Sequence, residues 1–365
     1  MTAIIDTTLR EGEQAPGVSF SLAEKKHIID GLAGIGIDEV ELGIASRLIE
    51  PPASLLRYCR RVHPRLSCSL WSRCMEKDIR FAAFLRPDIL SLSLPVSEIL
   101  LRDKLEKTRT WAGDCLSACL NIAEKLGMAV SVGFEDAFRA DPEFLVHMAR
   151  VAERHGALRI RLADTLGTST PAEVGERIGF LATILNRTSL AIHCHNDFGM
   201  ATANAIAALE HGADYADAAL FGLGERCGCT RLEELAGFLT LKRQGQYDLR
   251  RLPPLSRYVA KIAGRDISPD RPFIGEDIFT CESGLHLSAL YKNPQTYEPY
   301  PPETVGAERR LLLGPKAGRQ AILAHLEALG YRPDRCLGEA AVKAVRQSLA
   351  RQEINSDDLA AWLCR

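Results

Sequence analysis

Short β-rich runs alternate with amphipathic helical runs eight times through residue 243, and this alternation constrains the fold more than any other feature. The predicted strands span residues 3–7, 38–43, 66–71, 89–94, 129–134, 158–163, 190–195 and 215–221. The predicted helices between and after them include 22–32, 108–126, 142–155, 171–185, 201–211 and 232–243. This pattern is typical of an α/β protein with a (β/α)8 TIM barrel.

A doubly wound open sheet alternates in the same way, but it commonly carries a Gly-rich first turn. The first turn here reads TTLREGEQ and contains no GxGxxG. After residue 244 the alternation stops and prolines become frequent, and a helical pattern returns at 319–330 and 338–364. We therefore expect a catalytic barrel domain over 1–255 and a mostly helical C-terminal appendage over 256–365 that serves as a lid and dimerisation region.

Charge and hydropathy restrict the class of partner. The chain has 45 Lys and Arg against 47 Asp and Glu, without a basic block of the kind that follows a nucleic-acid backbone. It also has neither an N-terminal signal pattern nor an apolar run of about 18 residues. We expect a cytoplasmic enzyme that binds small molecules, not nucleic acid or membrane. The 11 cysteines are scattered and contain no CxxC pair, which predicts thiols that are mostly buried.

Polar residues collect directly after the predicted strands. In a TIM barrel the chemistry is built at the C-terminal ends of the strands, so this distribution predicts one shared site there. The residues concerned are Arg10, Glu11, Gln14, Arg73, Glu135, Asp136, Asp164, Thr165, His193, His195, Glu225 and Arg226.

The segment SLAIHCHNDFG at 189–199 suggests a metal site. Side chains alternate faces along a strand, so His193 and His195 share one face while the aliphatic residues occupy the other. Each histidine could also be an ordinary hydrogen-bonded polar residue. Two neutral imidazoles and a carboxylate from another strand end, with Glu11 the obvious candidate, would form a divalent metal site with open positions.

Six motifs resemble, in order and spacing, the family of 2-isopropylmalate and homocitrate synthases, which are metal-dependent acyl-CoA condensing enzymes. They are DTTLREGEQAPGVSF (6–20), FEDAFRAD (134–141), LADTLG (162–167), HCHNDFGMATANAIAALEHGA (193–213), GLGERCG (222–228) and FTCESGLH (279–286). Within this family, the segment at 92–111 and the short C-terminal part are most similar to the nitrogen-fixation type of homocitrate synthase.

The resemblance implies a Claisen condensation of acetyl-CoA with a 2-oxo acid on a divalent metal (Zn, Mg or Mn), followed by thioester hydrolysis. It also implies a homodimer that exchanges C-terminal segments. By resemblance, Glu11, His193 and His195 are metal ligands, and Arg10 stabilises the developing negative charge. Arg10, Gln14 and Thr165 contact the substrate, and Glu135 and His286 take part in proton transfer. Tyr297, together with His286, completes the active site of the neighbouring subunit.

Substrate choice stays open at this stage. Arg73 could bind the distal carboxylate of the 2-oxo acid, or it could be a structural partner.

The family usually has Asn where this chain has Cys229, so a thiolate ligand and a buried thiol without a role are both possible there. Ser131 stands where lysine-pathway homocitrate synthases carry Arg, and Cys281 replaces a histidine. We expect 2-oxoglutarate as substrate, with oxaloacetate, pyruvate or 2-oxoisovalerate as alternatives, and with a hydroxymethylglutaryl-CoA-type lyase or a non-catalytic barrel as hypotheses from other classes.

Overall fold

The computed structural model of the protein describes residues 2–46, 52–330, 339–352 and 359. The chain divides into two compact units, Met1–Ile267 and Ser268–Arg365. The division expected after residue 255 falls inside helix α9 (Leu252–Ile262). This helix belongs to the first unit because the Leu255 side chain packs so closely on Gly31 that a Cβ at residue 31 would lie 2.6 Å from it.

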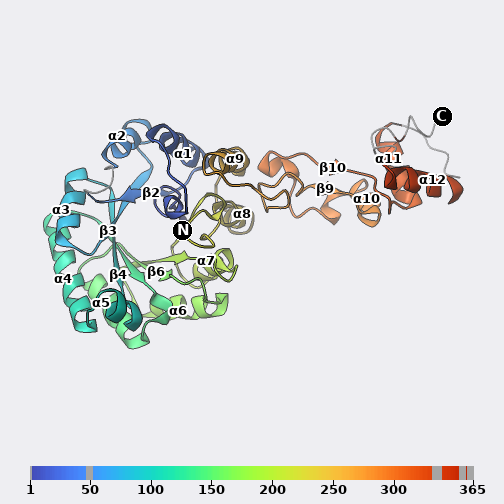
Figure 1. Ribbon diagram of the computed structural model, residues 1–365. Helices are drawn as coiled ribbons and strands as arrows, with labels where there is room; N and C mark the ends of the chain where they lie inside the picture. Colours follow the sequence, from blue (N-terminus) through green and yellow to red (C-terminus); the bar gives the residue numbers. More distant parts are fainter. Residues whose placement is uncertain (1, 47–51, 331–338, 353–358, 360–365) are drawn as a thin grey trace. The chain divides into compact units, whose positions relative to one another are not determined.

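The first unit is a closed parallel barrel, as the alternation predicts (Figure 1). Each strand pairs with the next, and β8 returns to β1 with Ala3 opposite Tyr215. In the described part of the unit the eight strands are β1 Ala3–Asp6, β2 Glu39–Ile44, β3 Ser67–Arg73, β4 Ile89–Pro95, β5 Val130–Glu135, β6 Arg159–Asp164, β7 Ser189–Cys194 and β8 Tyr215–Ala218. Strand β8 is shorter than predicted because a 3-10 turn follows it, in which Phe221 has a φ of 42°.

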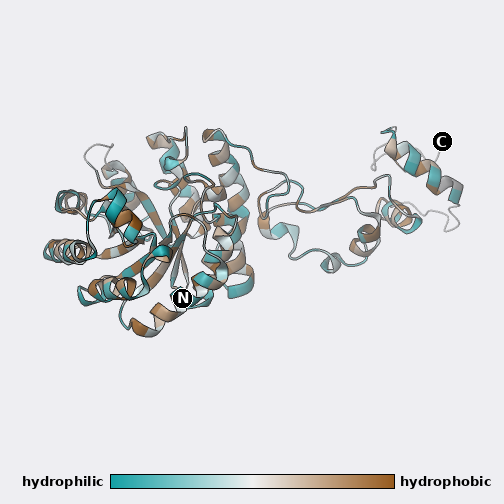
Figure 2. Cartoon of the chain, turned by 60° about the horizontal axis from the view of Figure 1, so that its bottom comes forward, coloured by the Kyte–Doolittle hydropathy of each residue, from teal (hydrophilic) through white to brown (hydrophobic). Residues whose placement is uncertain are grey.

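Helices surround the barrel, and their mixed hydrophilic and hydrophobic colouring in Figure 2 reflects one face on the strands and one toward solvent. They are α1 Leu22–Ile35, α2 Ala53–Val62, α3 Glu76–Leu85, α4 Arg109–Lys125, α5 Pro142–Arg154, α6 Pro171–Ile184, α7 Ala201–Glu210, α8 Leu232–Arg243 and α9. The local sequence determines where several of these helices begin. Ser21 and Glu24 form a capping box on α1, and Thr170 and Glu173 do the same on α6.

The barrel interior is unusually polar for this fold, in which bulky aliphatic residues commonly dominate. Arg159 on β6 is fully buried and makes a bidentate ion pair with Glu39 on β2, at 2.6 and 2.7 Å. Arg161, two residues further along, bonds to Glu41 at 3.0 Å and to the hydroxyl of Ser91 at 2.8 Å. Small residues on the neighbouring strands leave room for both arginines. The site therefore stands above layers of buried, paired charge.

The second unit is built from short elements, listed as β9 Thr280–Cys281, α10 Gly284–Leu290, β10 Arg310–Leu311, α11 Arg319–Ala328 and α12 Glu339–Ala350. Strands β9 and β10 pair in parallel. A small apolar core includes Leu287 of α10, Leu313, Ile322 of α11 and Val345 of α12. Helix α11 agrees with the helical pattern predicted at 319–330, and α12 covers the first half of the pattern predicted at 338–364; most of the rest of that segment lies outside the described residues.

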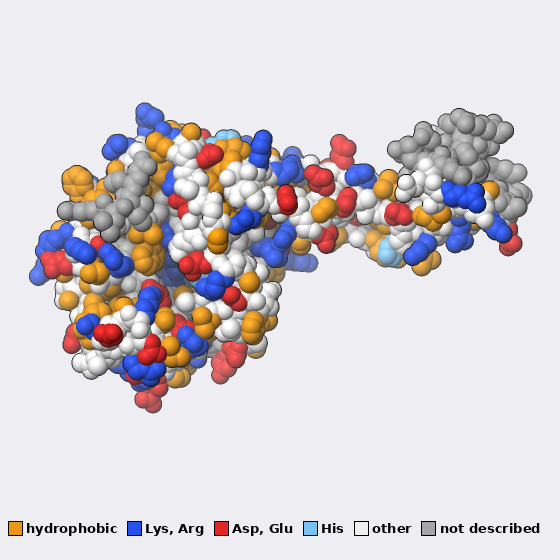
Figure 3. All heavy atoms as spheres, viewed as in Figure 1, with side chains coloured by type: hydrophobic (Ala, Val, Ile, Leu, Met, Phe, Trp, Pro, Cys, Tyr) orange, Lys and Arg blue, Asp and Glu red, His pale blue; other side chains and the backbone are white. Residues whose placement is uncertain are grey.

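Basic and acidic side chains are interspersed over the face of the first unit drawn in Figure 3. Among the described residues, none of the helices has both the length and the apolar character that crossing a bilayer requires.

Candidate active site

A cavity of about 290 Å³ opens among the C-terminal ends of the barrel strands. Its lining includes eight of the residues predicted from the strand ends, namely Arg10, Glu11, Gln14, Glu135, Thr165, His193, His195 and Glu225. Five separate segments of the chain contribute these side chains, and the barrel closure brings them together. The strand-end pattern thus marks the wall of a single pocket.

The loop after β1 is held in a tight turn that aims Arg10 and Glu11 at the cavity. The backbone N–H groups of Arg10, Glu11 and Gly12 all donate to the Thr7 carbonyl, at 3.0, 2.7 and 3.2 Å. Asp6 accepts hydrogen bonds from the backbone N–H and hydroxyl of Thr8, both at 2.9 Å. Hydrogen bonds within residues 6–12 therefore stabilise the conformation of this loop.

The loop after β8 closes over the same side of the cavity. Gly228 has a φ of 84°, and a Cβ there would lie 2.0 Å from the Gly222 carbonyl oxygen, so only glycine fits this approach. The resulting turn directs the backbone N–H of Glu225 to the Glu11 carboxylate at 3.4 Å. The GLGERCG motif thus forms part of the environment of Glu11.

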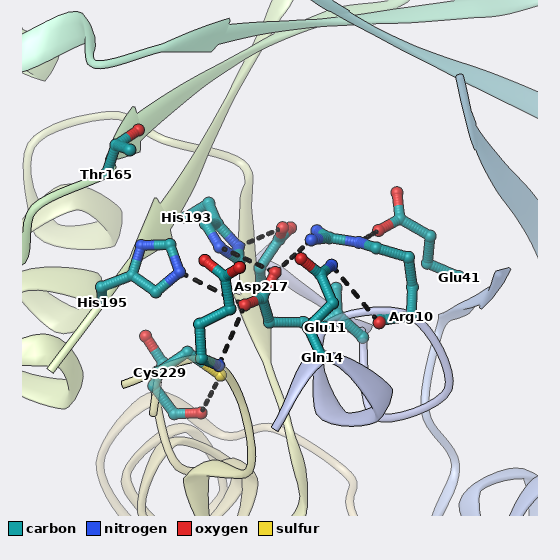
Figure 4. Close-up of polar contacts among 12 residues, drawn as sticks. Arg10, Glu11, Gln14, Glu41, Thr165, His193, His195, Asp217 and Cys229 are labelled. Atoms are coloured by element: carbon teal, nitrogen blue, oxygen red, sulfur yellow. Dashed lines mark hydrogen bonds and ion pairs between the residues drawn. The ribbon is translucent and has the colours of Figure 1, made fainter. Parts of the chain in front are cut away.

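His193 and His195 present the same nitrogen to the cavity (Figure 4). His193 Nδ1 lies 2.9 Å from Asp217 Oδ2, and His195 Nδ1 lies 3.3 Å from the backbone carbonyl of Asp164. A carboxylate and a carbonyl can only accept, so each Nδ1 donates in these contacts. Each Nε2 faces the Glu11 carboxylate, at 3.8 Å for His193 and at 3.3 Å for His195, where a hydrogen bond to Glu11 Oε1 requires a proton on Nε2 and binding of a metal ion requires its lone pair.

The charges around this cluster keep Glu11 ionised and His193 neutral. Burial opposes ionisation of Glu11, but the Arg10 guanidinium beside it outweighs this effect and holds the pKa of the Glu11 carboxyl below its ordinary value. For His193, burial lowers the pKa, although the Asp217 carboxylate acts in the opposite direction. Neutral imidazole and ionised carboxylate are the forms that bind metal.

The donor set fits a divalent metal ion. One ligand atom from each of Glu11, His193 and His195 lies within 4.8 Å of the other two, and all three residues are buried. Two imidazole lone pairs and a carboxylate face one another, and a cation between them satisfies all three acceptors. Nitrogen and oxygen ligands of this kind suit Zn²⁺ and, with water or substrate oxygens added, Mn²⁺ or Mg²⁺. Such an ion would supply Lewis-acid chemistry at the mouth of the barrel.

A charged network that sequence reasoning missed supports this cluster. Arg10 pairs with both Glu11 and Glu41, and Arg161 pairs with Glu41 and with Asp217 at 3.0 Å each. Asp217 in turn holds His193. A signal was present in the sequence, because glutamates alternate along β2 and arginines along β6 with the period of two that places them on the inner face. The network fixes Arg10 beside the candidate metal position.

The Cys229 thiol lies outside this ligand cluster. It is buried and lies 3.6 Å from the Leu223 carbonyl, to which it donates, and burial raises its pKa well above the ordinary value. A neutral thiol that donates to the backbone has the character of a packed residue.

Glu135 is the last residue of β5 and Thr165 directly follows β6, and both line the cavity. Glu135 Oε1 accepts from the Ser93 hydroxyl at 2.8 Å, and its Oε2 pairs with Lys104 at 2.9 Å. Lys104 is the last residue of a short π-helical turn, Leu100–Lys104. Lys104 was not predicted from the sequence as a site residue, because it does not directly follow a strand. The Thr165 hydroxyl accepts from the Asp136 N–H at 2.8 Å.

The other three predicted residues lie elsewhere. Arg73 is not among the residues that line the cavity; its side chain is 49% exposed and pairs with Asp78 of α3 at 2.7 Å. His286 and Tyr297 belong to the second unit, where their ring centroids are 4.0 Å apart. The pair therefore forms a local cluster of its own.

Comparison with known proteins identifies the family. Residues 1–259 match the HMGL-like family, and residues 273–353 match a domain described as homocitrate synthase post-HMGL domain-like. The chain belongs to the HMGL-like family. The resemblance of the six motifs is thereby confirmed.

Individual relatives cover most of the chain. The homocitrate synthase of Frankia alni is 38% identical over 89% of this chain and 93% of its own length. The 2-isopropylmalate synthase 2 of Caldanaerobacter subterraneus subsp. tengcongensis is 36% identical over 90% of this chain and 85% of its own length. The hydroxymethylglutaryl-CoA lyase structure from Pseudomonas aeruginosa has a TM-score of 0.66 and 20% identity, covering 73% of this chain and 94% of that one, and it supports the fold. The chain is therefore a condensing acyltransferase of this family.

An Asp217→Asn substitution is expected to weaken metal binding about 10-fold to 100-fold, as loss of a partner that orients a metal ligand commonly does. The neutral amide no longer favours the Nδ1-protonated form of His193, which leaves Nε2 free for the ion. Calorimetric titration with Mn²⁺ measures the effect. Asp214→Asn is the control, since Asp214 accepts from the Leu190 backbone N–H and lies outside the cluster; equal affinity in wild type and Asp217→Asn contradicts the assignment.

Proposed function

We propose that this enzyme condenses acetyl-CoA with a 2-oxo acid, and that the substrate is 2-oxoglutarate and the product homocitrate. The observation that carries the proposal is the convergence of Glu11, His193 and His195 beside Arg10 at the mouth of the barrel. A divalent ion held by these three residues would act as a Lewis acid toward the keto group of a 2-oxo acid. The Zn, Mg and Mn ions all remain candidates.

The chain's own groups have separable tasks in this reaction. The acetyl methyl group loses a proton, its carbon forms a bond to the keto carbon, and the keto oxygen becomes a hydroxyl group. Arg10, fixed by Glu41, stabilises the negative charge that develops on oxygen. Glu135, held by Ser93 and Lys104, is placed to take part in proton transfer, with Gln14 and Thr165 as substrate contacts. Water then cleaves the thioester to a carboxylate and free CoA thiol.

The basic side chains of the cavity support a dicarboxylic substrate. Arg161 lines the cavity, is 5% exposed, and its Nε has no hydrogen-bond partner among the described residues. Lys104 provides a second cation on the same wall as Glu135. A distal carboxylate could pair with either group, whereas pyruvate has no such group and 2-oxoisovalerate carries an isopropyl group instead. The match of residues 273–353 to the homocitrate synthase domain supports the same choice.

A homodimer in which C-terminal segments are exchanged is part of the proposal. His286 and Tyr297, whose rings lie together, would complete the site of the neighbouring subunit. We also propose a cytoplasmic location and a role of the nitrogen-fixation type. These points rest on the resemblance of the motifs.

The test is a thiol-release assay with acetyl-CoA and Mn²⁺, Mg²⁺ or Zn²⁺ against 2-oxoglutarate, oxaloacetate, pyruvate and 2-oxoisovalerate. We expect CoA release that depends on both metal and 2-oxo acid and is fastest with 2-oxoglutarate. A clear preference for another acid would replace the substrate assignment but keep the reaction class. Metal-dependent cleavage of hydroxymethylglutaryl-CoA without condensation would overturn both.

A further inference from the structure

Three cysteines that the reaction does not use lie together at the side of the barrel. Cys74 directly follows β3, and Cys115 and Cys119 lie one turn apart on the same face of α4. Their sulfur atoms all lie within 4.8 Å of one another. The chain thus gathers three thiols from segments about 40 residues apart in sequence, which scattered buried cysteines have no reason to do.

The cluster has the spacing that a thiolate metal site needs. With Zn–S bonds of about 2.3 Å, tetrahedral geometry separates sulfur ligands by about 3.8 Å, within reach of small side-chain rotations here. Cys74 and Cys119 are buried, at 6% and 4% exposure, while Cys115 is partly exposed. The exposed side gives an ion a route of entry and leaves a fourth coordination position for water.

Two of the three thiols also contact each other's backbone. Cys115 Sγ lies 3.4 Å from the Cys74 carbonyl, and Cys74 Sγ lies 4.0 Å from the Cys115 carbonyl. These two contacts join the residue after β3 to helix α4.

We propose that Cys74, Cys115 and Cys119 form a second metal site, specific for a thiophilic cation such as Zn²⁺ and separate from the site at the barrel mouth. Three sulfur donors favour Zn²⁺ over Mg²⁺ and Mn²⁺, whereas the nitrogen and oxygen donors of the mouth accept all three. An ion bound here joins α4 to the residue that follows β3, and β4 and the Lys104 turn lie between these two segments in the chain. It would stabilise the part of the barrel that carries the Lys104 turn, without taking part in the chemistry.

Cobalt distinguishes the two sites, because only thiolate ligands produce an intense near-ultraviolet charge-transfer band with Co²⁺. The full chain, reduced and stripped of metal, is titrated with Co²⁺ and then with Zn²⁺. We expect a charge-transfer band that Zn²⁺ abolishes. The band should be lost in the Cys115→Ser/Cys119→Ser double variant and kept in His195→Ala and in Cys229→Ser, the matched thiol outside the cluster.

A second measurement on the wild-type chain does not depend on a variant that folds. Mass spectrometry after alkylation of the native protein should show Cys115 modified without metal and protected when Zn²⁺ is present. No band in the reduced wild type, a band that disappears only in Cys229→Ser, or a disulfide among the three thiols in place of protection by Zn²⁺ would each overturn the proposal.

Discussion

The His195→Ala variant is expected to lose turnover by about 10³-fold or more and to bind divalent metal far more weakly than the wild type. His195 Nε2 is one of only three acceptor groups in the described ligand cluster, and it lies 3.3 Å from the Glu11 carboxylate. Removing it leaves one imidazole and one carboxylate. Two protein ligands would hold a metal ion beside Arg10 much less firmly, so the variant would lose the Lewis acid that the proposed reaction requires.

The control for this variant is His147→Ala, because His147 lies on the exposed face of α5 and stacks on Phe144 outside the cavity. Thermal unfolding of both variants checks that the barrel persists. Metal content by elemental analysis, calorimetric titration and the thiol-release rate are measured together. Unchanged metal content and rate in His195→Ala would refute the assignment of this residue, whichever 2-oxo acid the enzyme prefers.

The sequence predicts the barrel well because each strand and helix carries its own periodicity. The α6 segment, for example, begins at Thr170 and Pro171 and needs no tertiary information to be recognised. The predicted meeting of polar side chains at the strand ends is found for eight residues that line the cavity, because parallel strands in a closed barrel share one C-terminal edge.

The sequence did not predict the buried ion pairs or the orientation of Arg73, because these depend on contacts that form only in the folded barrel. Glu41 and Arg161 are 120 positions apart in the chain, so only the closed register makes them partners. Arg73 is the last residue of β3 as Glu135 is of β5, yet the Arg73 side chain pairs with Asp78 on the first turn of α3. A local ion pair of this kind competes with a role in the cavity, and sequence position alone does not decide between them.

The same buried charges link the stability of the barrel to its chemistry. Arg159 and Glu39 form an ion pair in the barrel interior. Two residues further along β6, toward the C-terminal ends of the strands, Arg161 forms ion pairs with Glu41 and Asp217. At the mouth of the barrel, a bound metal ion would add a positive charge beside the Glu11 carboxylate and so continue this arrangement of paired charges. A barrel filled with aliphatic side chains could be as stable, but it could not hold an ionised Arg10 and a neutral His193 side by side.

An Arg159→Met substitution is therefore expected to lower the free energy of unfolding by about 3–5 kcal/mol, because it leaves an ionised carboxylate in the barrel without its partner. Arg159 is completely buried, bonds to both oxygens of Glu39, and donates to the Ser131 hydroxyl at 3.0 Å. Urea denaturation followed by circular dichroism measures the change. Metal affinity at the mouth should stay near the wild-type value, since Arg159 is not among the residues that line the cavity.

The double variant Glu39→Leu/Arg159→Met separates the cost of an unpaired charge from the cost of lost packing. Replacing both partners with apolar residues removes the stranded carboxylate, so the double variant should be more stable than Arg159→Met alone. Arg80→Met is the surface control, because the exposed pair of Arg80 with Glu76 at 2.7 Å is expected to contribute less than about 1 kcal/mol. If the double variant is as unstable as Arg159→Met, packing around the long arginine side chain, and not its charge, holds this layer of the barrel together.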